Sequence, residues 1–382
     1  MQTRRDFLKS SSALMTARFL HSGRSHYGTP SLSARAAAKG LLYGASAVKS
    51  TLAGDADYAE AFAAQCGVLA TDWEAKWHIL HPTPTTYNFA AADWLLDFAT
   101  QRHMVFRAHT LVWHLDLPAW FPAYANPSNA RQLLLGYVEI VVGRFRDRVS
   151  SWDVVNEVIN PDDGRQDALR NSPWLHLIGP DYIETAFHAA ASTDPRALLV
   201  YNEDSLEYDT PYADRKRAAV LRLLERLKSK GVPVHALGIE AHLVAARDPF
   251  SPTKLSRFLQ DVSGMGLKIL VTETDVSDRH LPATITVRDQ KVADEYARFL
   301  APVLDNKSVV AVLTWGLSDR YTWLRKFAPR ADEQAVRPLP LNVDFHPKLA
   351  WHAVANSFDH APARTNPWAH DKRAHPSSKM ST

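Results

Sequence analysis

Short apolar runs recur along the chain, and longer segments with one apolar face separate them. The runs are rich in Val, Ile, Leu and Ala, which is typical of strands buried on both faces of a parallel sheet. Eight strands are predicted, at residues 41–45, 68–71, 104–108, 152–157, 197–203, 236–239, 268–275 and 309–315. Helices are predicted at 57–65, 92–101, 128–146, 211–228 and 347–358, and a further helix is predicted to end near Ser192.

This alternation of strands and helices predicts an α/β fold. Eight βα units favour a single closed (β/α)8 TIM barrel, a fold that commonly takes about 250 residues or more. The alternative is an open doubly wound sheet, but no Gly-rich nucleotide fingerprint follows the first strand. We therefore expect one barrel domain at residues 39–358.

The two ends of the chain are not predicted to be part of the barrel. Residues 3–9 contain the pair Arg4-Arg5 and precede a modestly apolar segment, as in a twin-arginine export signal, although Arg18 interrupts the apolar part. Residues 34–36 offer a small-residue cleavage site. We expect 1–38 to be an export signal and disordered arm of a periplasmic or extracellular protein; the alternative is a disordered arm with a chance arginine pair. Residues 359–382 are polar and basic and are predicted to be a loose tail.

Composition excludes several classes of protein. Of the 382 residues, 46% are hydrophobic and 22% charged, as in a soluble globular protein with a large core. The net charge of +3 is mild and no basic stripe stands out, so no nucleic-acid partner is implied. No apolar stretch approaches the ~18 residues of a membrane span. The single cysteine, Cys66, excludes an internal disulfide and is predicted to be buried.

Carboxylates stand at the ends of two predicted strands. The strand at 152–157 ends in Asn156 and Glu157, and the strand at 268–275 carries Glu273 near its end. A (β/α)8 barrel keeps its chemistry at the C-terminal ends of its strands. Two carboxylates there are the parts of a glycosidase, one as acid/base and the other as nucleophile. The alternative, a strand that simply becomes polar as it reaches solvent, is weakened by the repetition.

The chain resembles glycoside hydrolase family 10, the endo-β-1,4-xylanases. The matching segments are 109–114, 152–157, 201–202, 238–242, 271–275 and 314–319. Each motif alone is only moderately specific, but their joint order and spacing cover the whole barrel. The resemblance implies hydrolysis of internal β-1,4-xylosidic bonds of xylan or xylo-oligosaccharides. It implies no cofactor, and because the histidines lack paired-ligand spacing, no metal is expected. We expect a monomer.

By this resemblance, Glu157 is the acid/base and Glu273 the nucleophile of a retaining mechanism. Asn156 resembles the family's donor to the sugar 2-hydroxyl, a bond that strengthens in the transition state. His242 resembles the partner of the nucleophile, with Asp275 fixing its ring. The expected substrate-binding residues on the side before the scissile bond are Lys76, His109, Trp113, Trp315 and Trp323. For Trp113 and Trp315 the alternative is an ordinary core position.

The chain departs from the family's pattern at four places, one of which is a pair of residues. Asp72 and Trp73 stand where Glu-Asn is usual, which removes an amide that would bind the distal sugar and adds bulk. Asp116 replaces a Gln, and Asp204 replaces an aromatic residue that would stack on the leaving side. Glu240 replaces a Gln before the sixth-strand histidine. These changes affect the preference for sugar and chain length, and Asp72, Trp73 and Glu240 remain candidate substrate-binding residues.

Glu240 has two possible roles. It places a third carboxyl near Glu157 and Glu273, so at least one pKa in the cluster is expected to be raised. Alternatively, Glu240 is fully ionised, paired to His242 or Lys76, and serves only as a sugar acceptor. The sequence leaves both open.

Two rival functions are also open. A β-1,4-glucanase or an enzyme for short xylo-oligosaccharides would keep the mechanism, and Trp73 and Trp323 would decide whether a hydroxymethyl group fits. A weak glycan-binding barrel would need no acid/base pair, and the retention of Glu157 and Glu273 weighs against it.

Other polar residues receive structural interpretations. Glu203 and Asp319 are expected in ion pairs, and Glu74 is expected to be exposed. His114 is expected to be either a core histidine or one that contacts the residues of the site without touching substrate.

Overall fold

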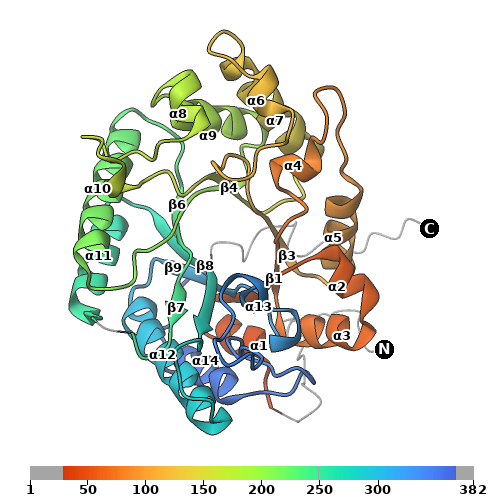
Figure 1. Ribbon diagram of the computed structural model, residues 1–382, viewed down its shortest axis with the longest axis vertical. Coiled ribbons are helices and arrows are strands. Elements are labelled where there is room, and N and C mark those ends of the chain that lie inside the picture. The colour runs from red at the N-terminus through yellow and green to blue at the C-terminus, as the bar shows by residue number, and fades with distance from the viewer. Residues whose placement is uncertain (1–28, 248, 367–382) are drawn as a thin grey trace, which may run out of the picture.

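The computed structural model describes residues 29–247 and 249–366 of the chain. These residues form a closed barrel of parallel strands surrounded by a ring of helices (Figure 1). Around the barrel the strands run β6-β5-β4-β3-β2-β1-β9-β8, and pairing of β6 with β8 closes the circle. This arrangement confirms the predicted single (β/α)8 barrel.

The strands lie where the apolar runs predict them. They are β1 (Leu42–Ala47), β2 (Val68–Thr71), β3 (Val105–Ala108), β4 (Ser151–Asn156), β5 (Leu198–Glu203), β6 (Ala236–Ile239), β7 (His242–Val244), β8 (Lys268–Ser277) and β9 (Val309–Thr314). β6 and β7 are two parts of the sixth barrel strand, and β7 pairs only with the outer end of β8, with His242 opposite Asp275. The strand breaks at Ala241, whose φ of 60° lies in the left-handed region that residues other than glycine seldom adopt.

The helices confirm the predicted segments and add short ones. They are α1 (Leu32–Ala37), α2 (Lys49–Gly54), α3 (Ala56–Gln65), α4 (Trp77–Leu80), α5 (Ala90–Gln101), α6 (Phe121–Tyr124), α7 (Ala130–Arg144), α8 (Pro173–Ile178), α9 (Tyr182–Thr193), α10 (Pro211–Ser229), α11 (Pro252–Gly264), α12 (Ile285–Asp305), α13 (Leu324–Phe327) and α14 (Leu349–His360). α10 shows how sequence sets a helix end: the Thr210 side chain accepts from the Ala213 amide, and Pro211 fits the first turn.

Two apolar cores hold the fold together. The interior of the barrel is filled by small and branched side chains, including Val68, Val105, Val200, Leu270 and Leu313. A larger core lies between the strands and the helices and contains most of the buried aromatic rings. The strands are therefore buried on both faces, which explains why their sequences show continuous apolar runs.

The N-terminal boundary of the fold differs from the prediction. Residues 32–37 were assigned to a disordered arm, but they form α1, which packs against α14. The Ser31 hydroxyl caps the helix by accepting from the Ala34 amide, and Leu32 and Ala36 are fully buried. The small-residue segment 34–36 lies inside this packed helix rather than before the fold. The twin-arginine-like residues lie outside the described part of the chain, so the export signal stays a prediction.

The C-terminal boundary also extends past residue 358. α14 continues to His360, and Ala361 after it is buried. Arg364 donates to the main-chain carbonyls of Leu304, Asn306 and Val309 at 2.6–2.9 Å. The first residues of the predicted loose tail therefore pack against the barrel, and residues 367–382 lie outside the described chain.

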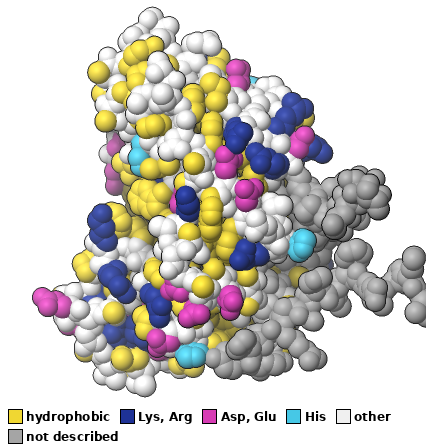
Figure 2. Space-filling model, turned by 90° about the vertical axis from the view of Figure 1, so that its right-hand side faces the viewer, with side chains coloured by type: hydrophobic (Ala, Val, Ile, Leu, Met, Phe, Trp, Pro, Cys, Tyr) yellow, Lys and Arg dark blue, Asp and Glu magenta, His cyan; other side chains and the backbone are white. Residues whose placement is uncertain are grey.

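Three further expectations, on Cys66, on surface charge and on membrane spans, can be compared with the described residues. Cys66 is a buried free thiol, as predicted. On the face shown in Figure 2, basic and acidic side chains are interspersed rather than separated by sign. None of the helices in the described ranges is both long and apolar enough to cross a bilayer.

Candidate active site

A cleft of about 720 Å³ opens at the C-terminal ends of the strands. Among its lining residues are Asp72, Trp73, Lys76, His109, Trp113, Asn156, Glu157, Glu240, His242, Glu273, Trp315 and Trp323. Of the site residues predicted from the sequence, only Asp275 is not part of the lining. It is fully buried behind His242, with its Oδ1 3.1 Å from His242 Nδ1.

Glu157 follows β4 directly and has a φ of 51°, a left-handed backbone conformation of the kind that concentrates at functional sites. Asn156 Nδ2 donates to its Oε1 at 3.1 Å, and Arg170 Nη2 lies 3.8 Å from its Oε2. Burial and the neighbouring charge of Asp204 raise the pKa of Glu157 to about 7, against the opposing effect of Arg170. A carboxyl with this pKa is protonated below neutral pH and can donate a proton.

Glu273 lies within β8 and has a different environment. Its Oε1 accepts from Asn202 Nδ2 at 2.8 Å, and its Oε2 lies 3.4 Å from His242 Nε2. Burial alone would raise the pKa of Glu273, but the charges of His109, His242 and Lys76 lower it to about 2. The environments of Glu157 and Glu273 thus push their pKa values apart, which is how two carboxyls come to act as acid and nucleophile.

Two histidines lie beside Glu273: His109, whose Nδ1 is 3.6 Å from Oε1, and His242 at the other carboxylate oxygen. The pKa of His242 is raised well above the usual value: burial acts against this, but Asp275 and Glu273 outweigh burial. Trp323 Nε1 donates to the other oxygen of Asp275 at 2.6 Å, and the Trp323 ring lies 5.0 Å from the His242 ring. Asp275 therefore orients both a charged histidine and a tryptophan of the cleft.

Asn202 contacts several polar residues of the cleft, although the sequence assigned it no role. Its Nδ2 lies within hydrogen-bond distance of Asn156 Oδ1 at 2.8 Å, Glu273 Oε1 at 2.8 Å and Glu240 Oε1 at 3.2 Å. Gly238 makes room for this amide, because a Cβ there would lie 2.2 Å from Asn202 Oδ1. The matched segments 201–202 and 238–242 are the only signal that sequence offers for this connection.

One wall of the cleft combines a lysine with aromatic rings. Lys76 Nζ lies 4.2 Å from the Trp73 ring, 5.0 Å from the Trp113 ring and 3.9 Å from Asp72 Oδ1. Burial raises the pKa of Asp72 to about 6. The Trp315 ring lies 5.3 Å from His109 on the same wall. Trp73 is 42% exposed and stands at the mouth of the cleft.

The opposite side of the cleft carries an ion-pair network. Lys216 is fully buried, pairs with Asp204 and lies 2.8 Å from Glu203, as expected for a structural role of Glu203. Arg170, which sequence reasoning missed, lies 3.6 Å from Asp204 and links this network to Glu157. Tyr212 also lines the cleft, 5.8 Å from Lys216, so an aromatic ring is present on this side despite Asp204.

The predictions for the remaining polar residues have different outcomes. Asp319 pairs with Lys348 at 2.8 Å, which confirms its place in an ion pair. His114 is only half-buried, and burial lowers its pKa to about 4. Asp116 lies against His78. The prediction that Glu74 is exposed is wrong. Its side chain is buried, and the main-chain amides of Lys49 and Trp73 donate to its carboxylate.

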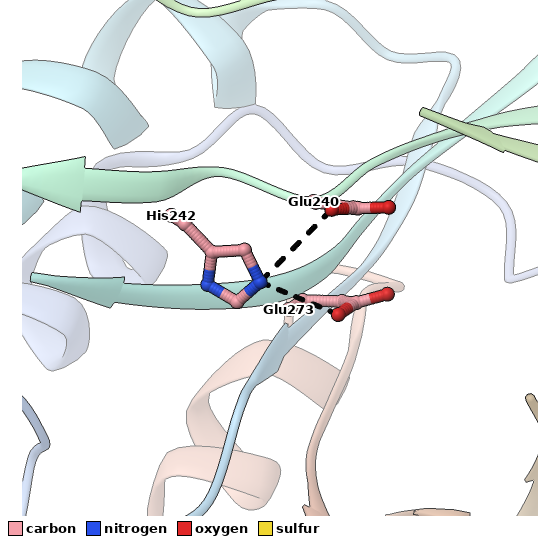
Figure 3. A group of neighbouring side chains, drawn as sticks. All are labelled: Glu240, His242 and Glu273. Atoms are coloured by element: carbon pink, nitrogen blue, oxygen red, sulfur yellow. Dashed lines mark ion pairs between the residues drawn. The ribbon is translucent and has the colours of Figure 1, made fainter. Parts of the chain in front are cut away.

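Within the described residues, one group has spacing suited to a shared ion. Atoms of Glu240, His242 and Glu273 all lie within 4.8 Å of one another, which would allow either a metal ion or a shared proton (Figure 3). The sequence predicts no metal, and that expectation stays a prediction.

A (β/α)8 barrel with an acidic pair of opposed pKa values in an aromatic-lined cleft defines a glycoside hydrolase. The model for Glycosyl hydrolase family 10 matches residues 31–357, and the chain belongs to that family. It is 34% identical over 295 residues to the Beta-1,4-xylanase of Dictyoglomus thermophilum, covering 75% of this chain and 80% of the relative.

The chain is also similar to other proteins named as xylanases. The chain is 34% identical over 302 residues to endo-1,4-beta-xylanase B of Thermotoga neapolitana, covering 78% of this chain and 82% of that protein. Xylanase 10B of Thermotoga petrophila, solved in complex with xylobiose, superposes with a TM-score of 0.79 at 29% identity, covering 88% of this chain and 99% of that one.

Proposed function

We propose that this protein is a retaining endo-1,4-β-xylanase that cleaves internal bonds of xylan. The observation that carries the proposal is the pair formed by Glu157 and Glu273, one carboxyl with a pKa near 7 and the other with a pKa near 2 in the same cleft. Family membership and the names of the curated relatives, which are xylanases, support the substrate.

In the first step, ionised Glu273 attacks the anomeric carbon while protonated Glu157 gives its proton to the departing glycosidic oxygen. The carbon–oxygen bond to the leaving chain breaks as the ester bond to Glu273 forms. In the second step, the Glu157 carboxylate takes a proton from a water molecule. The oxygen of that water attacks the anomeric carbon, and the ester bond to Glu273 breaks. Both carboxyls then regain their starting protonation states, and the anomeric configuration is retained.

Neighbouring side chains support each step. His242, held by Asp275, stabilises the ionised form of Glu273 before attack. Asn156 is held by Asn202 and lies beside Glu157, where it is placed to donate to a sugar hydroxyl.

The substrate-binding role falls to the wall of the cleft. Lys76 and His109 offer donors to sugar hydroxyls. Trp113, Trp315 and Trp323 offer flat faces to the apolar faces of the rings.

The experiment that tests this function is reducing-sugar release by the purified protein from xylan and from carboxymethylcellulose. Release from xylan with little from carboxymethylcellulose is expected. Preferential release from carboxymethylcellulose would favour the glucanase, and binding to xylan without release would favour a glycan-binding barrel.

Export and a monomeric state are also proposed, on the sequence alone. Cell fractionation of the full chain and of an Arg4→Lys/Arg5→Lys variant tests export, because the paired arginines are the recognised feature. Size-exclusion chromatography with light scattering tests the monomer, for which a mass near 42.7 kDa is expected for the full chain.

A further inference from the structure

We propose that Glu240 is a neutral carboxylic acid while the enzyme works, and that it serves as a hydrogen-bond donor beside Glu273. The inference deepens the proposed function, on which it rests. Glu240 follows β6 and is 4% exposed, and its carboxyl group lines the cleft. Figure 3 shows Glu240 and Glu273 side by side. His242 lies to one side of the pair, and one of its ring nitrogens is directed at both carboxyl groups.

His242 is the one cation recorded within ion-pair distance of Glu240 in the described chain, and it serves other groups first. Its Nδ1 lies 3.1 Å from Asp275, and its Nε2 lies 3.4 Å from Glu273 but 4.0 Å from Glu240. An imidazolium has one hydrogen on each ring nitrogen. Both hydrogens are therefore directed to other carboxylates, and Glu240 receives no hydrogen bond from His242.

The remaining cations near the cleft are paired elsewhere. Arg170 lies near Glu157 and Asp204, Lys216 pairs with Glu203 and Asp204, Lys76 lies near Asp72, and His109 lies 3.0 Å from Asp153. The alternative in which Glu240 is ionised and paired to Lys76 is therefore not the arrangement found here.

The side-chain amide of Asn202 cannot stabilise a negative charge on Glu240 in addition to the charge on Glu273. It has two hydrogens for three acceptors, and its distance to Glu240, 3.2 Å, is longer than its distances to Asn156 and Glu273, both 2.8 Å. A buried carboxylate without a cation or a full set of donors is costly, and such a group takes up a proton instead.

The groups facing Glu240 are mostly acidic. They are Glu157 from the end of β4, Asn202, Glu203 and Asp204 from β5 and its end, His242 from β7, and Glu273 from β8. Two further carboxylates contact its sequence neighbours: Glu207 accepts from the Ala241 amide, and Asp275 pairs with His242. Burial first, and then the charges of Glu273 and Glu157, raise the pKa of Glu240 well above its usual value. The proton makes Glu240 an uncharged donor, so it adds no second negative charge beside the ionised Glu273.

Infrared difference spectroscopy tests the protonation state without depending on activity. The comparison uses a Glu157→Gln background, which removes the other protonated catalytic carboxyl, at near-neutral pH and after treatment with a chelator. We expect a carboxylic acid C=O band that is lost in Glu157→Gln/Glu240→Gln and kept in Glu157→Gln/Glu139→Gln, since Glu139 is exposed on α7. Equal spectra for the two double variants would overturn the inference while leaving the xylanase proposal intact.

The pH profile of kcat/KM for Glu240→Gln gives a second test. Replacing a neutral acid by a neutral amide leaves the charge around Glu157 unchanged, so the alkaline midpoint set by Glu157 is not expected to fall. Removing an ionised Glu240 would instead lower that midpoint by about one unit, because a nearby negative charge would no longer raise the Glu157 pKa. Such a fall would overturn the inference, and circular dichroism establishes that the variant is folded.

Discussion

Replacing Arg170 with methionine removes a cation that lies 3.8 Å from the Glu157 carboxyl. At that distance two unit charges interact by about 1 kcal/mol in water and about 4 kcal/mol at an effective dielectric constant near 20. Since about 1.4 kcal/mol corresponds to one pKa unit, the pKa of Glu157 would rise by about 1 to 3 units. Both side chains are partly exposed, at 17% and 16%, and Arg170 is shared with Asp204, so we expect about one unit.

The assay is the pH dependence of kcat/KM on a xylo-oligosaccharide. In the proposed mechanism the protonated form of Glu157 is active, so activity is expected to fall as pH rises through its pKa of about 7. Arg170 stabilises the carboxylate, and its removal favours the protonated form. The alkaline midpoint of Arg170→Met should therefore move up by about one unit.

Two control variants separate charge from structure. Arg170→Lys keeps the positive charge but loses the bond from Arg170 Nε to the Glu157 carbonyl, and its midpoint should stay within about half a unit of the wild type. Arg215→Met removes an exposed arginine that pairs with Asp162, and should not move the midpoint. An Arg170→Met midpoint equal to or below that of the wild type would refute this electrostatic account of Glu157.

Two further predictions follow from the site. Glu273→Ala should abolish activity on all substrates because no glycosyl-enzyme can form, whereas Glu157→Ala should spare the first step on an aryl xylobioside with a good leaving group; equal losses on that substrate would show that the roles are wrongly assigned. Gly238→Ala should displace Asn202, lower stability by about 1–3 kcal/mol and cut kcat/KM at least about tenfold, measured by thermal unfolding and kinetics. Gly136→Ala in α7, where an added Cβ meets nothing within 4 Å, is the matched control, and equal effects of the two would contradict the packing argument.

Much of the fold could be predicted because each barrel strand is an apolar run that is visible locally. Features that depend on contacts between residues far apart in the sequence could not be predicted. α1 has only six residues and buries Leu32 and Ala36 against α14, more than 300 residues away in the sequence. The break of the sixth strand at Ala241 has no local signal, since nothing about an alanine predicts a φ of 60°. From the sequence, Arg364 was assigned to a basic tail, because the main-chain carbonyls that it binds, those of Asn306 and Val309, cannot be identified from the sequence.

The site shows the same division. The strand ends placed Glu157 and Glu273 correctly in a common cleft, because parallel barrel strands deliver their C-terminal ends to one side. The sequence could not decide between the two roles of Glu240, since the answer depends on which carboxylate each cation lies nearest. Asn202 was missed for a similar reason: its partners Asn156 and Glu273 are 46 and 71 residues away.

The central claim is a retaining hydrolysis by two carboxyls, and proton NMR of the first products tests it most directly. A xylo-oligosaccharide is hydrolysed with enough enzyme to release product before mutarotation, and the anomeric signals of the new reducing end are followed with time. The account predicts that the β-anomer appears first and the α-anomer only later, as mutarotation proceeds. Early appearance of the α-anomer would mean inversion and would contradict the roles given to Glu157 and Glu273.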